Sequence, residues 1–197
     1  MSLPLANTSA RYGGVAMTLH WLIAGALIVN IGLGLYMSEV LSNGDASRLA
    51  ILPLHKSVGL TVLLLSVVRL SWRLVNPVPP LPESMPPVLR IAARASHVFL
   101  YFLIVAIPLT GWALVSASRT AAPTLYFGVF HWPNMSFLAQ LPRAEKIPLH
   151  RGFGLVHITL AWSAILLVPL HVFGALYHHW RGDDVLRRML PGTGIAG

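Results

Sequence analysis

The feature that most constrains this chain is a run of 29 residues without formal charge, Gly152 to Trp180, that nevertheless contains four histidines. About 20 apolar residues in a helix span a bilayer, so this run is long enough to cross one. Ionisable side chains at membrane depth are costly and usually mark a functional site. His157 and His171 lie fourteen residues apart, so a helix places them on one face about 21 Å apart. The run therefore predicts a membrane helix that offers one imidazole toward each side of the bilayer.

The composition extends this interpretation to the whole chain. Of its 197 residues 55% are hydrophobic and only 10% are charged, which is typical of an integral membrane protein. The absence of cysteine excludes disulfides, thiolate-bound metal clusters, c-type haem attachment and thiol catalysis. A net charge of +8 could suggest nucleic-acid binding. The basic residues, however, lie at the ends of apolar runs, where they orient membrane helices.

Hydropathy predicts four membrane-spanning helices. They cover about residues 15–38, 53–74, 95–118 and 149–180, with a proline-rich linker at 76–87 and an interfacial loop at 119–148. The N-terminus lacks the pattern of a cleaved signal peptide, so we expect the first run to remain as a helix. The expected fold is an all-α integral membrane four-helix bundle of up-down topology, forming a single domain over residues 1–197. Eight basic residues on one side against six on the other favour both termini in the cytoplasm.

Histidines on the other three predicted helices can partner those of the fourth. These are His20, His55 and His97, each early in its helix. Depth in an up-down bundle pairs His20 with His171 and His55 with His157. His150 lies on the same helical stripe as His157 and, on this reasoning, stays an alternative partner of His55.

Facing imidazoles in a membrane suit three kinds of chemistry. Two of them can hold a b-type haem as axial ligands. A transition-metal site would want carboxylates, thiolates or more ligands at one level, and a proton relay usually includes intramembrane acids. No Asp or Glu lies inside any predicted helix, which favours haem. Each histidine taken singly could still be a hydrogen-bonded packing residue, and a histidine-lined transporter stays an alternative.

Several motifs resemble the bacterial cytochrome b561 family over nearly the whole chain. They are LHWL at 19–22, LHKSVG at 54–59, VVRLSWRL with the following NPVPPLP at 67–82, ASHVFLYFLIVAIPLTGW at 95–112, and LYHHWRGDDVLRRMLP at 176–191. The resemblance implies two b haems, one held by His20 and His171 and the other by His55 and His157, in preference to His150. Within this family, the chain resembles the stand-alone members, of superoxide oxidase type, more than the larger haem subunits.

Such a protein is expected to oxidise superoxide at the periplasmic face of the bacterial inner membrane and to reduce ubiquinone. The alternative is a haem b subunit that carries electrons for a separate dehydrogenase or other redox partner, as in larger relatives. The resemblance places the quinone site near His97 and His178, whose imidazoles could hydrogen-bond a quinone carbonyl or pass a proton.

Basic residues at the two mouths of the bundle have two expected uses. We call the haem expected between His20 and His171 the inner haem, and the one expected between His55 and His157 the outer haem. Arg69 and Arg73 are placed to bind the propionates of the inner haem, and Lys56 and Arg151 are placed to bind those of the outer haem. The outer basic residues are Arg48, Lys56, Arg119, Arg143, Lys146 and Arg151. Of these we assign Lys56, Arg119 and Arg151 to the capture of superoxide, because a positive mouth concentrates a small anion. The alternative is that they only anchor helix ends.

Overall fold

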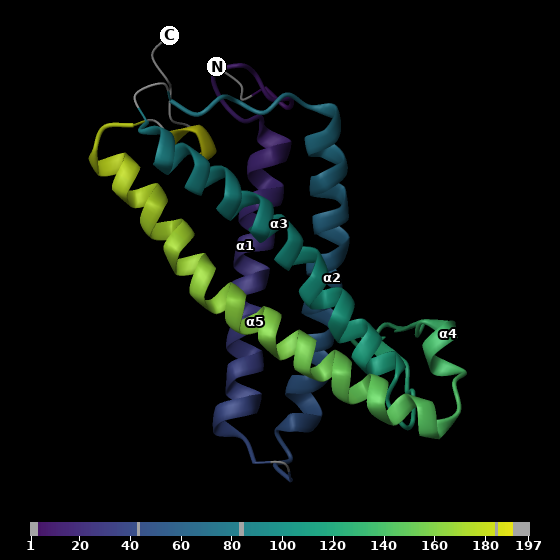
Figure 1. The fold of residues 1–197 in the computed structure, drawn as a ribbon. Coiled ribbons are helices and arrows are strands. Elements are labelled where there is room, and N and C mark those ends of the chain that lie inside the picture. Colours follow the sequence, from purple (N-terminus) through teal and green to yellow (C-terminus); the bar gives the residue numbers. More distant parts are fainter. Residues whose placement is uncertain (1–3, 43, 83–84, 184, 191–197) are drawn as a thin grey trace.

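The computed structural model describes residues 4–42, 44–82, 85–183 and 185–190, and four long helices dominate it (Figure 1). These are α1 (Gly14–Leu35), α2 (Arg48–Val75), α3 (Pro87–Ser116) and α5 (Arg143–Trp180). The short elements are the π-helical turn η1 (Tyr36–Val40), strands β1 (Thr124–Tyr126) and β2 (Phe130–Trp132), α4 (Ser136–Ala139) and the 3-10 turn η2 (Arg187–Met189). The long helices run alternately up and down, so α1 begins and α5 ends at the same end of the molecule.

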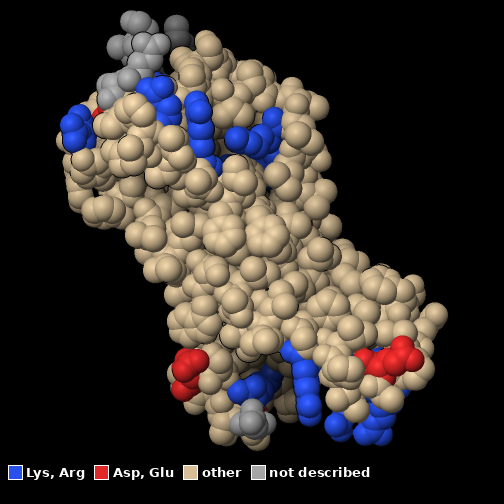
Figure 2. Space-filling model, viewed as in Figure 1, with Lys and Arg blue, Asp and Glu red and all other residues tan. Residues whose placement is uncertain are grey.

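The predicted membrane four-helix bundle is confirmed. Each long helix is long and apolar enough to cross a membrane. Leu166 and Phe173 on α5 illustrate the outer surface, because both large apolar side chains are exposed. Figure 2 shows that Lys, Arg, Asp and Glu gather at the two ends, with a broad band free of charge between them. A band of this kind suits a hydrocarbon environment rather than water.

The helices pack as two hairpins, α1 with α2 and α3 with α5, which α2 and α3 join. One buried cluster between them consists of Ile23, Leu27, Val62 and Ile104, and a second of Leu103, Ile107 and Ala164. Ser66 is fully buried beside these clusters, and its hydroxyl donates to the Ile104 carbonyl at 3.4 Å. Pro108 has no N–H to offer that carbonyl, so the serine satisfies it in its place.

The observed helices begin earlier than hydropathy predicts. Helix α2 begins at residue 48 rather than 53, α3 at 87 rather than 95, and α5 at 143 rather than 149. Hydropathy marks only the part of a helix that matches hydrocarbon, whereas backbone hydrogen bonding continues into the polar headgroup region. The predicted loop at 119–148 also contains more structure than expected, namely β1, β2, α4 and the first turns of α5.

Arg48 closes the connection between α1 and α2. Its guanidinium donates to the carbonyl of Met37, to that of Leu41 at 3.0 Å and to that of Ser42 at 2.9 Å. The Met37 and Leu41 carbonyls lie at the end of the first helix, where backbone carbonyls lack helical partners. Ser42 follows in the connection, and its carbonyl also accepts from the Asp45 N–H at 3.2 Å. Arg48 therefore has a structural role, although the sequence placed it among the basic residues of the outer mouth.

Arg48→Met should lower the stability of the bundle. The substitution keeps the apolar stem but removes a charged donor from three carbonyls, which should cost about 1–2 kcal/mol. For a chain of this size the thermal midpoint in detergent should fall by about 2–6 °C. Arg143→Met, at an exposed position, is the control and should leave the midpoint within about 1 °C. Equal midpoints for the two variants would contradict the structural role of Arg48.

Candidate functional site

Two imidazoles face each other in the half of the bundle remote from the termini. The ring centres of His55 on α2 and His157 on α5 are 6.3 Å apart, with the rings almost perpendicular at 87°. Nδ1 of His55 lies 3.1 Å from the Asn30 carbonyl, and Nδ1 of His157 lies 2.9 Å from that of Ile107. A proton on each Nδ1 donates to that carbonyl, which leaves Nε2 with a free lone pair. Metal-binding histidines are commonly held in this way.

Glycines make room for both of these rings. A Cβ on Gly34 of α1 would lie 3.4 Å from Cε1 of His55, and a Cβ on Gly111 of α3 would lie 3.1 Å from Cε1 of His157. The second distance is too short for an ordinary contact, so any larger side chain at Gly111 would push the His157 ring. The sequence offered only the general signal that glycines permit close packing.

A second group of imidazoles lies toward the end where the chain begins. The ring centres of His20 on α1 and His171 on α5 are 6.3 Å apart at 76°. His97 on α3 also contacts His171, with ring centres 5.3 Å apart. The structure thus brings three histidines together here. The sequence had paired only His20 with His171 and had assigned His97 to quinone binding.

Both facing pairs fit an axially ligated haem b. Two metal–nitrogen bonds of about 2 Å, together with the distance from each nitrogen to its ring centre, place two imidazoles about 6 Å apart. The observed spacing is 6.3 Å in each pair. Over the described residues, no group of three or more His, Asp or Glu could hold a metal ion by itself. A porphyrin iron would need only two axial ligands from the protein, and each facing pair offers two imidazoles.

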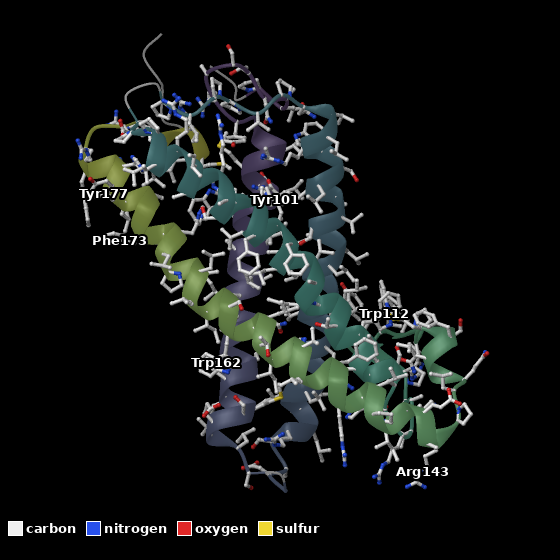
Figure 3. All side chains as sticks on the ribbon, in the orientation of Figure 1. Tyr101, Trp112, Arg143, Trp162, Phe173 and Tyr177 are labelled. Atoms are coloured by element: carbon white, nitrogen blue, oxygen red, sulfur yellow. The ribbon has the colours of Figure 1, made fainter. Side chains whose placement is uncertain are left out.

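Basic and aromatic side chains surround a small pocket at the inner end of the bundle. The Arg73 and Arg69 guanidinium groups lie 4.9 and 5.6 Å from the ring centre of Tyr101, and Arg69 also donates to the Ala16 carbonyl at 2.8 Å. Figure 3 shows Tyr101 on α3, within the part of the bundle nearer the termini. Tyr12, Arg69, Trp72, Arg73 and Tyr101 are among the residues that line this pocket.

Two further donors line this pocket, and the sequence did not predict either. The buried Trp72 Nε1 has no hydrogen-bond partner among the described residues. Burial raises the pKa of the Tyr12 phenol, with Arg73 beside it acting in the opposite direction. The phenol therefore keeps its proton at neutral pH. Together with Arg69, these groups offer the donors that a haem propionate would need.

The basic residues of the outer mouth differ in exposure. Arg119, Arg143 and Arg151 are exposed, whereas Lys56, next to His55, is partly buried. Lys146 is buried. Figure 2 shows the molecule hollowed between two lobes at the end opposite the termini, with Lys and Arg side chains at the hollow. An anion that approaches this end therefore meets positive charge near the outer imidazole pair.

His178 lies two turns beyond His171 on α5, where the helix ends. It is buried, and its Nδ1 is 2.8 Å from Oδ2 of Asp183. Its ring contacts that of Tyr177, whereas the His97 ring contacts His171. The two histidines expected at a quinone site thus have different neighbours. Sequence reasoning missed Asp183, although it follows shortly after the helix end in the motif HHWRGDD.

The sequence is similar to known proteins over nearly its whole length. The family model described as prokaryotic cytochrome b561 matches residues 11–192. Cytochrome b561 homolog 2 of Escherichia coli (strain K12) is 38% identical over 186 residues, which cover 93% of each chain. The probable superoxide oxidase CybB of Yersinia pestis is 27% identical, covering 92% of this chain and 96% of its own. Cytochrome b562 of Cereibacter sphaeroides is 29% identical, with 91% and 96% covered.

Gly111→Ala should reduce binding of the outer haem. Because the new Cβ would come 3.1 Å from His157, the ring must shift away from its partner, and we expect the haem content per chain to fall by about a quarter to a half. The content is measured from the reduced-minus-oxidised spectrum of purified protein. Gly152→Ala is the matched control, since a Cβ there meets nothing within 4 Å. A full haem content in the Gly111 variant would contradict the close packing.

Proposed function

We propose, for a chain that belongs to the prokaryotic cytochrome b561 family, that its electron transfer runs from superoxide at the periplasmic face to ubiquinone in the membrane. The family carries electrons through membranes with haem b, and this chain is a multi-pass membrane protein with four candidate spanning helices. One observation carries the proposal. Helix α5 holds two histidines fourteen residues apart, and each faces an imidazole of another helix at 6.3 Å.

Two b haems are the cofactors, one between His20 and His171 and the other between His55 and His157. Each haem supplies a one-electron carrier when it is bound. The two sites lie about 21 Å apart along α5, against a hydrocarbon thickness of about 30 Å. Arg69 and Arg73, with Tyr12 and Trp72 beside them, bind the inner propionates. Lys56 and Arg151 bind those of the outer haem.

Superoxide is the electron donor at the outer mouth, where Lys56, Arg119 and Arg151 attract it. Two superoxide anions each lose one electron and leave as dioxygen. The two electrons and two protons convert ubiquinone to ubiquinol, so atoms and charge balance. Support comes from the exposed basic residues of this mouth and from similarity to a protein named probable superoxide oxidase. Dioxygen is neutral and is not held by the same charges.

Ubiquinone is reduced at the inner end of the bundle, which holds the chain termini. His97 and His178 lie toward this end. His97 contacts His171, so a quinone that bonds to it lies beside the inner haem ligand. His178 with Asp183 forms a carboxylate–imidazole pair, which can hold a proton for transfer to the reduced quinone. The proposed location is the bacterial inner membrane, with both termini in the cytoplasm.

Haem stoichiometry tests the ligand assignment. Wild-type protein should contain two b haems per chain, and His157→Ala and His171→Ala should each lose a different one, because haem iron loses an axial ligand in either case. The measurement is haem content with the reduced-minus-oxidised spectrum. His150→Ala is the control and should retain both, since its Nδ1 lies 3.0 Å from the Leu114 carbonyl and the ring facing His55 is that of His157. Two haems retained in His157→Ala would overturn the outer pair.

Arg119→Gln, at an exposed arginine of the outer mouth, should slow ubiquinone reduction by superoxide. In nanodiscs at low ionic strength we expect a rate about 2–5 times lower, and the difference should shrink in 0.5 M salt because salt screens the attraction. Arg94→Gln changes an exposed arginine at the other end and should leave the rate unchanged. Superoxide dismutase should abolish the reaction. A wild-type protein with both haems that does not reduce ubiquinone from superoxide would instead indicate a haem b subunit for a separate redox partner.

A further inference from the structure

The segment between α3 and α5 forms a β-hairpin, residues 124–132, whose tip lies against the middle of α2. The hydroxyl oxygens of Tyr126 and Thr61 are 2.8 Å apart. The Phe127 N–H donates to the Ser57 hydroxyl at 3.0 Å. The base of the hairpin is held at the end of α3, where the Met135 N–H donates to the Ser116 hydroxyl at 3.0 Å. The hairpin therefore extends from the end of one membrane helix toward the centre of another.

The position of its contacts on α2 gives the depth of the tip. The charge-free part of this helix runs from Ser57 to Val68, between Lys56 and Arg69. At 1.5 Å per residue, Thr61 lies about 2 Å and Ser57 about 8 Å from the centre of that part. The hydrocarbon layer extends about 15 Å to either side of its midplane. Lys56 lies about 10 Å from the same centre and reaches the headgroup level through its long side chain. The tip residues contact α2 nearer the centre, at the level of acyl chains rather than of water.

The hairpin satisfies the backbone requirements of such a position. Its strands pair in antiparallel register, with Tyr126 opposite Phe130. Phe127 and Gly128 have positive φ of 46° and 77°, and the Val129 N–H donates to the Tyr126 carbonyl at 2.9 Å. The positive φ values and this bond are typical of a type I′ turn over residues 126–129, and with Tyr126 opposite Phe130 the hairpin loop has three residues, 127–129. Polar backbone groups in hydrocarbon must find partners within the protein, which explains why Ser57, a fully buried serine, points at the turn.

The outer surface of the tip is apolar. Leu125 is 43% exposed, Phe127 49%, Val129 78% and Phe130 48%. The hairpin contains no Asp, Glu, Lys or Arg. Four neighbouring large apolar side chains facing water would be an unusual surface for a loop. Near the base the sequence turns to His131 and Trp132, which are residue types suited to the headgroup level.

We propose that hairpin 124–132 is a re-entrant element, immersed in the leaflet opposite the chain termini, with Phe127, Val129 and Phe130 in contact with lipid acyl chains. It fills the space beside α2 and the end of α3 that lipid would otherwise occupy. A protein partner is disfavoured as the occupant because the tip contacts α2 at the level of the hydrocarbon. The hairpin therefore belongs to the membrane domain, although hydropathy predicts an interfacial loop.

Depth measurement on single-cysteine variants tests this directly, because the chain has no cysteine of its own. Val129→Cys carries a spin label in nanodiscs, and collision with dioxygen is compared with collision with a water-soluble nickel chelate. Leu166→Cys, exposed at the middle of α5, is the reference for the bilayer centre. Arg143→Cys, exposed at the first residue of α5, is the reference for water. Haem spectra equal to wild type confirm that each variant is folded.

We expect the dioxygen-to-nickel collision ratio at Val129 to lie within about 3-fold of that at Leu166 and at least 5-fold above that at Arg143. A ratio equal to that at Arg143 would overturn the proposal. A label that is open to the nickel chelate in nanodiscs but protected in native membranes would also overturn it, in favour of a protein partner. Ser57→Ala should shift the Val129 ratio toward the water reference, whereas Ser163→Ala, at another serine that bonds a carbonyl, should not.

Discussion

A hydrogen bond from an imidazole Nδ1 to a backbone carbonyl fixes one histidine ring in each of the two helix hairpins. In the α1–α2 hairpin it joins His55 to Asn30, and in the α3–α5 hairpin it joins His157 to Ile107. An imidazole surrounded by apolar side chains must have its polar atoms paired. Pairing Nδ1 within its own hairpin leaves Nε2 of each ring free, and the two rings face each other across the bundle.

Other polar groups in the spans follow the same requirement. The Ser66 hydroxyl bonds the Ile104 carbonyl that Pro108 leaves free, and Ser57 and Thr61 bond the hairpin rather than solvent. Arg48 donates hydrogen bonds to the carbonyls of Leu41 and Ser42, just after the first helix. In a low-dielectric environment an unpaired donor or acceptor costs several kcal/mol. These pairings decide where helices may end and where non-helical backbone can lie at membrane depth.

The two mouths of the bundle use positive charge differently. At the end that holds the chain termini, Arg69 and Arg73 lie against Tyr101 beside a small, partly open pocket, and their burial suits the lasting binding of an anionic group. At the outer end, Arg119 and Arg151 are exposed and suit the transient attraction of a small anion. The same residue type thus supports the proposed propionate binding at both ends, and where it is exposed it also suits the proposed capture of superoxide.

The sequence by itself determined the membrane class, the four apolar helices and the spacing of His157 and His171, because hydropathy and the 3.6-residue period are local properties of the chain. Its resemblance to the cytochrome b561 family is confirmed by the family comparison. Depth along the predicted helices already paired His20 with His171, and the tertiary structure decided that His157 rather than His150 faces His55. Only the tertiary structure showed that His97 contacts His171 and that His178 contacts Asp183. It also decided that Arg48 binds carbonyls and that residues 124–132 pack against α2. These outcomes depend on crossing angles and on hydrogen bonds between segments distant in sequence, and no local pattern encodes them.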